Sequence, residues 1–197
     1  VSREMRDVQA RLDHMDALAI DVQVQADWMG LLATNAAPTL DASKSPTLSS
    51  ITEDAGAPAG QVGTLVSSLV DLATPAGQVD NVTDTDSGAQ TGIAVTGANT
   101  SNGTWYFSTN NGSTWSALGA VSEGSARLLA ADANTRIYFR PNADYNGTMS
   151  DAITFRAWDQ TSGTAGSTAD LTGTITNTVK DQFSSASYSN NNGTVNW

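Results

Sequence analysis

The chain has 197 residues and a formal net charge of -11 at pH 7, which is enough length for one domain with a real core and some additional pieces. It contains no cysteine, and this excludes a disulfide scaffold, a thiol nucleophile and a zinc site built on thiolates. The negative charge argues against nucleic acid and anionic membranes as partners. No run of about 18 apolar residues occurs, so we expect no membrane span.

The acidic residues are strongly biased toward aspartate, which supplies 17 of the 20 acidic side chains. Aspartate suits both tight turns and oxygen-rich metal loops, so the bias favours calcium as a partner. An acidic surface poor in lysine also keeps a secreted protein in solution. Composition alone leaves both interpretations open.

Residues 1–33 are predicted to form one long amphipathic α-helix. Apolar or small residues recur there at alternating steps of four and three, which is a heptad pattern. The residues of this seam are Val1, Met5, Val8, Leu12, Met15, Ala19, Val22, Ala26 and Met29. A helix of this kind needs a packing partner, so we expect it either to fold back on the chain or to mediate assembly, as a homo-oligomer or with neighbouring repeats.

Residues 34–178 are predicted to form an antiparallel β-sandwich. Period-two segments bounded by turn residues indicate strands at 92–96, 104–108, 126–129, 135–140, 152–158 and 169–175. Asn111-Gly112 predicts a hairpin turn, because both residues accept positive φ. The segment Val62–Leu72 fits either a strand or a short helical turn, and residues 179–197 form a polar tail or begin a further module.

The side chains that support catalysis are scarce. The only histidine is His14, in the predicted helix, so a Ser-His-Asp constellation is not expected. Six aromatic side chains offer either core packing or an exposed platform for a sugar or peptide, and strand alternation favours the core. They are Trp105, Trp115, Trp158, Tyr106, Tyr138 and Phe139. We therefore expect a protein that is not an enzyme.

Residues 35–177 resemble the bacterial Ig-like and cadherin-like repeats of large secreted surface adhesins, including the RTX type. The resemblance rests on phrases that occur in order along the chain. They are Asn35-Ala36-Ala37-Pro38, Ile51-Thr52-Glu53-Asp54-Ala55-Gly56, Val82-Thr83-Asp84-Thr85-Asp86-Ser87-Gly88, Gly103 to Gly112, Leu129-Ala130-Ala131-Asp132, Phe139 to Gly147 and Thr154-Phe155-Arg156-Ala157-Trp158-Asp159. The resemblance implies a β-sandwich on a cell surface, strung in tandem and often stiffened by calcium at domain junctions.

The same resemblance implies calcium ligands in the acidic loops. The first set is Glu53, Asp84, Asp86 and Asp159, and the second choices are Asp80, Asn81 and Asp144. The alternative is that these side chains cap turns through nearby backbone amides.

Together these expectations describe a non-enzymatic structural or adhesive module of a secreted bacterial cell-surface protein. Its β-sandwich would be stabilised by Ca²⁺, its helix would mediate assembly, and a filament subunit is one form of this. A surface glycan or a protein would be the adhesion ligand. The alternatives are a carbohydrate-binding module, which requires exposed aromatic rings, and an accessory domain of an extracellular enzyme.

Overall fold

The computed structural model describes residues 35–173, 188–189 and 195–196. The chain divides into two units between Thr34 and Asn35, and all described residues belong to the second unit. The strands are β1 Thr39–Leu40, β2 Thr64–Leu65, β3 Val82–Thr83, β4 Gly92–Ala98, β5 Gly103–Ser108, β6 Ser116–Ala117, β7 Ala126–Ala130, β8 Arg136–Pro141, β9 Thr148–Met149, β10 Ile153–Trp158, β11 Thr168–Ala169, β12 Tyr188–Ser189 and β13 Val195–Asn196. A short 3-10 helix, η1, spans Val66–Ser68.

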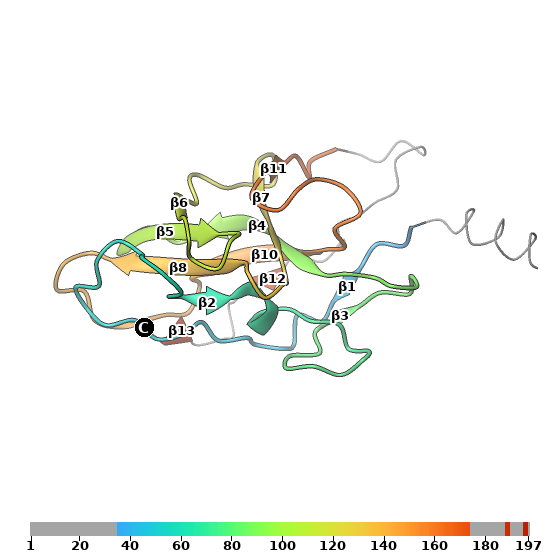
Figure 1. The fold of residues 1–197 in the computed structure, drawn as a ribbon, viewed down its shortest axis with the longest axis horizontal. Helices are drawn as coiled ribbons and strands as arrows, with labels where there is room; N and C mark the ends of the chain where they lie inside the picture. Colours follow the sequence, from blue (N-terminus) through green and yellow to red (C-terminus); the bar gives the residue numbers. More distant parts are fainter. Residues whose placement is uncertain (1–34, 174–187, 190–194, 197) are drawn as a thin grey trace, which may run out of the picture. The chain divides into compact units, whose positions relative to one another are not determined.

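Two larger sheets dominate this unit (Figure 1). One has the strand order β11-β7-β4-β10-β12, and the other has the order β2-β8-β5-β6. Two short pairs, β1 with β3 and β13 with β9, complete the pairing. Every pairing between these named strands is antiparallel.

The two larger sheets share one hydrophobic core because alternate residues of each strand point toward the other sheet. Ile93 and Val95 of β4 lie in the same buried cluster as Phe139 of β8. Trp105 of β5 is also in it, with its ring centroid 4.9 Å from that of Phe139. This shared core defines a two-layer β-sandwich.

A second buried cluster lies on the other face of the five-stranded sheet. It contains Ala94, Leu128 and Trp158, whose chain neighbours Ile93, Leu129 and Ala157 belong to the main core. Ala165, Ala169 and Leu171 from the segment after β10 pack against it. Both faces of this part of the sheet are therefore apolar and covered, which explains the continuous apolar runs of β4 and β7.

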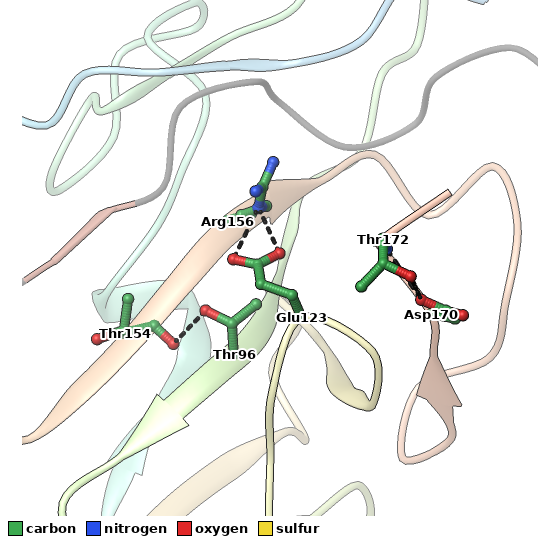
Figure 2. A network of polar contacts seen from close by, with 6 residues as sticks. All are labelled: Thr96, Glu123, Thr154, Arg156, Asp170 and Thr172. Carbon is green, nitrogen blue, oxygen red and sulfur yellow. Dashed lines mark hydrogen bonds and ion pairs between the residues drawn. The ribbon is translucent and has the colours of Figure 1, made fainter. Parts of the chain in front are cut away.

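Elsewhere the same face is polar. Thr96 is the extra residue of a β-bulge, since Thr154 pairs with Gly97 and Phe155 pairs with Val95. Figure 2 shows the Thr96 hydroxyl close to Thr154, where it donates to the backbone oxygen at 3.4 Å. Arg156, the next residue of β10 on this face after Thr154, forms an ion pair with Glu123, with 3.0 Å between Nε and Oε2.

Most of the predicted strands are confirmed. The segments at 92–96, 104–108, 126–129, 135–140 and 152–158 correspond to β4, β5, β7, β8 and β10. The hairpin turn is also confirmed, with φ of 54° at Asn111 and 85° at Gly112 between paired β5 and β6. Both alternatives for Val62–Leu72 occur, because β2 leads directly into η1.

The strand predicted at 169–175 is wrong over its described part. The structure has only the two-residue β11, and residues 170–173 are not in a strand. The apolar side chain of Leu171 packs against the second cluster instead of taking part in a longer ladder. Leu171 is apolar because it covers this cluster, and its place in the sequence gave the segment the alternation of a strand.

The predicted fold class also needs correction, because it included a long N-terminal α-helix. The structure is mainly β with antiparallel sheets, and its described residues contain no α-helix. Residues 1–33, where the helix was expected, lie outside the described residues. A heptad pattern shows where a helix would bury an apolar stripe, but its stability depends on a packing partner that the pattern does not supply.

The described part of the chain contains no helix that is long and apolar enough to cross a membrane.

Candidate metal site

A pocket lies where the start of β4 meets the end of β10. These strands are antiparallel, and Gly92 at the start of β4 faces Trp158 at the end of β10. The acidic loop that leads into β4 therefore meets the residues that follow β10. Asp84, Asp86 and Asp159 line this pocket of about 300 Å³, together with Asn35 and Gln160.

Asp159 is the most buried of the three carboxylates, with 4% of its surface exposed. Its Oδ2 accepts a hydrogen bond from Asn35 Nδ2 at 2.7 Å. Its Oδ1 accepts bonds from the backbone N–H and the hydroxyl of Thr161, at 3.0 and 2.9 Å. The carboxylate is thus fixed in place at the end of β10.

Asp84 and Asp86 lie in the loop between β3 and β4. Asp84 Oδ1 accepts the backbone N–H of Asp86 at 2.9 Å, while Asp86 Oδ2 accepts the backbone N–H of Ala36 at 2.8 Å. Asp84 Oδ2 is inaccessible to solvent and has no hydrogen-bond partner among the described residues. A buried acceptor without a donor costs about 1–3 kcal/mol, and more when it is charged.

A bound calcium ion would satisfy this oxygen. Calcium takes six to eight oxygen ligands from carboxylates, amides, backbone carbonyls and water, and the pocket offers three carboxylates and the Asn35 side chain. These are oxygen ligands of the type that a hard cation takes. In the described structure no three Asp, Glu, His or Cys side chains are grouped closely enough to hold a metal ion, so calcium binding would require these carboxylates to come closer together.

The surroundings of the pocket carry negative charge. A second pocket, of about 470 Å³, shares Gln90 and Gln160 with the first and is lined by two further carboxylates, those of Asp71 and Asp132. No lysine or arginine lines either pocket. A cation entering here meets no positive side chain among the lining residues.

Glu53 and Asp144 are not brought to this pocket. β7 ends beside the start of β4, and β8 begins after a short turn and runs back to Pro141, so the loop after β8 lies at the other end of the sheets. In that loop Asn146 Nδ2 donates to Glu53 Oε2 at 3.2 Å. Nearby, the backbone N–H of Asp144 donates to Asp54 Oδ1 at 2.9 Å.

The other second-choice residues serve the local backbone. Asn81 is 1% exposed, and its amide accepts the N–H of Asp71 and donates to the carbonyl of Leu69. Asp80 Oδ1 accepts the N–H of Gly77 at 2.6 Å. Neither residue lines the pocket of Asp84 and Asp159, so in this structure both act as turn and loop ties.

Core packing is confirmed for Trp105, Trp158, Tyr138 and Phe139, whereas Trp115 and Tyr106 are only partly buried. Trp105 and Trp158 are 2% and 1% exposed, and their indole N–H groups donate to the carbonyls of Asn99 and Ser162. Neither ring is available as a platform for a sugar. His14 lies outside the described residues.

Asn35 is the pocket residue that sequence reasoning did not select as a ligand. In the sequence it is only the first residue of the phrase Asn35-Ala36-Ala37-Pro38, yet its side chain donates to Asp159 and the backbone N–H of Ala36 donates to Asp86. The signal was present, because an amide beside an expected inter-domain junction is a natural oxygen ligand.

A scan against protein-family models found no match, and searches of curated proteins and of solved structures found none either.

Proposed function

We propose that the chain is a non-enzymatic structural or adhesive module of a secreted bacterial cell-surface protein, and that calcium stabilises its β-sandwich. The ion would be held by Asp84, Asp86 and Asp159. The observation that carries the proposal is the inaccessible, unpartnered Oδ2 of Asp84, a residue that lines one pocket together with two other carboxylates.

The proposed ion would tie three segments that are distant in the sequence. Asp84 and Asp86 belong to the loop before β4, Asp159 follows β10, and Asn35 and Ala36 begin the described unit. Calcium binding would therefore fasten the incoming chain to one end of the sandwich. Such an ion adds stiffness at the point where a preceding segment is connected.

This arrangement suits a structural module that is held rigidly to the segment before it. The partners would be adjoining modules or other copies of the chain, with a surface glycan or protein as the adhesion ligand. The burial of Trp105 and Trp158 gives no support to the alternative of a carbohydrate-binding module built on those rings.

Thermal unfolding of the full chain, in excess calcium and in chelator, tests the proposal. A ligand that binds only the folded state adds about 2.7 kcal/mol at a hundred times its dissociation constant. For a domain of this size that corresponds to a rise in melting temperature of roughly 5–10 °C. Magnesium at the same concentration should have a smaller effect, because it demands a tighter octahedral geometry and gives up water reluctantly.

The matched variants are D86N, in the pocket, and D170N, whose exposed carboxylate is bonded only to Thr172 among the described residues. We expect D86N to lose most of the calcium-dependent rise and D170N to keep it. Equal melting temperatures of the unaltered chain in calcium and in chelator would refute the calcium site.

A further inference from the structure

Three Asn-Gly pairs occur in the described residues, at positions 102–103, 111–112 and 146–147. In such a pair the backbone nitrogen of the glycine can attack the side-chain amide of the asparagine, because glycine has no side chain to obstruct the approach. The reaction requires an accessible amide and a peptide free to rotate. The fold determines which of the three pairs meets these conditions.

The pair Asn146-Gly147 meets them. Both residues are exposed and lie in the loop between β8 and β9. Among the described residues, the amide makes one hydrogen bond, from Nδ2 to Glu53 Oε2 at 3.2 Å, and both side chains are exposed. We find no hydrogen bond from the backbone N–H of Gly147 to another described residue.

The pair Asn111-Gly112 is held in place. Asn111 Oδ1 accepts a bond from Arg136 Nε at 2.7 Å, and the buried N–H of Gly112 donates to the Ser108 hydroxyl at 2.9 Å. A Cβ on Gly112 would collide with the backbone of Gly60, so the turn is closely packed. Both the attacked carbonyl group and the attacking nitrogen are engaged.

The pair Asn102-Gly103 is held by the sheet. Gly103 is buried, begins β5 and pairs with Pro141 of β8. The backbone carbonyl of Asn102 accepts the N–H of Asn142 at 2.8 Å. Rotation of this peptide toward the side chain would break the pairing between β5 and β8.

We propose that Asn146 is the site of spontaneous deamidation in this part of the chain. The nitrogen of Gly147 attacks Cγ of Asn146, a C–N bond forms, and the side-chain nitrogen leaves as ammonia with the proton released by Gly147. Water then opens the succinimide at either carbonyl, which yields aspartate or isoaspartate at position 146. No oxidant, reductant or enzyme is required.

The product changes the contact between two loops. A carboxylate replaces the amide that donated to Glu53, so the hydrogen bond is lost and two like charges face each other. Asp54 and Asp144 are joined nearby by a side-chain to backbone bond and add to the negative charge. Deamidation thus loosens the tie between the Glu53 loop and the loop after β8.

The test is to incubate the full chain at mildly alkaline pH and follow each Asn-Gly pair by peptide mass spectrometry. A parallel sample in denaturant gives the rate of each pair in the unfolded chain. We expect Asn146 to react in the folded protein within a few-fold of its unfolded rate. Asn102 and Asn111 should be slowed by at least about tenfold, since they must wait for local opening.

The variant N146Q serves as the control, because it should remove the early product and leave the slow behaviour of the other two pairs unchanged. The proposal is overturned if Asn146 is protected in the folded chain as strongly as Asn111. It is also overturned if all three pairs react at the same rate in the folded protein.

Discussion

The substitution D84N is expected to change stability in opposite directions with and without calcium. In the structure Asp84 Oδ2 is inaccessible and has no partner in the described residues, while Oδ1 accepts the N–H of Asp86. Asparagine has the same shape and keeps an oxygen for Asp86. It replaces the unpaired charged oxygen with a neutral amide nitrogen, in a residue that lines the same pocket as Asp86 and Asp159.

Without calcium, the gain from removing a buried unsatisfied acceptor is about 1–3 kcal/mol. With calcium at a hundred times its dissociation constant, the unaltered chain gains about 2.7 kcal/mol, which the variant loses because a ligand is gone. The order of the two melting temperatures should therefore reverse. D84N should melt at a higher temperature than the unaltered chain in chelator and at a lower temperature in calcium. At roughly 2–4 °C per kcal/mol the differences are readily measured.

The assay is thermal unfolding of both proteins by circular dichroism, in chelator and in saturating calcium. If D84N is less stable in both conditions by the same amount, the carboxylate has a partner that the reasoning overlooks. If it is more stable in both, the charge is a defect that no calcium ion relieves. Either result would refute the argument from the unpaired oxygen.

Two further predictions concern the core and its edge. G163A should lower stability by about 2–4 kcal/mol, because Gly163 has φ of 77° and an added Cβ would collide with Leu128. The control is G173A, whose added Cβ meets no described residue within 4 Å and should change stability by less than about 0.5 kcal/mol in denaturant melts. Burial raises the pKa of Tyr138 above its ordinary value of 10.0. The stabilisation of the folded state that comes from this shift is therefore present below pH 10 and is lost as the pH rises through the pKa of the folded protein. Y138F should abolish this loss of stability in melts measured at a series of alkaline pH values.

These two predictions fail on clear outcomes. Equal melts for G163A and G173A would mean that the segment covering Leu128 adapts to a side chain, so the second cluster is less tightly packed than its contacts indicate. If the fall in stability at alkaline pH persists in Y138F, it comes from another group and not from Tyr138, whose hydroxyl donates to the carbonyl of Gly56 at 3.1 Å in the folded protein.

The long strands could be predicted from the sequence because their burial follows a simple period. Trp105 and Phe107 alternate with the half-exposed Tyr106 along β5, and Asn111-Gly112 marks the turn that follows. The segment after β10 could not be predicted in this way. Leu171 is partly buried because it covers the far face of the sheet, and periodicity does not distinguish such a cover from a strand.

Three of the four calcium ligands implied by the resemblance line one pocket, because strand pairing brings their loops together, and the calcium site itself stays a prediction. Asp84, Asp86 and Asp159 flank the two ends of β4 and β10 that antiparallel pairing brings together. Glu53 depends on the course of the irregular segment between β1 and β2, which no period specifies, and the structure places it against Asn146 instead. The N-terminal helix was predicted from a heptad pattern alone, and such a pattern does not show what the helix would pack against.

A structure determined from crystals grown with calcium would test the central claim most directly. The account predicts one calcium ion in the pocket, with oxygens of Asp84, Asp86 and Asp159 about 2.3–2.6 Å from it and the Asp84 carboxylate turned toward the ion. A pocket without the ion at saturating calcium, or an ion held instead by Glu53 and its neighbours, would contradict the account.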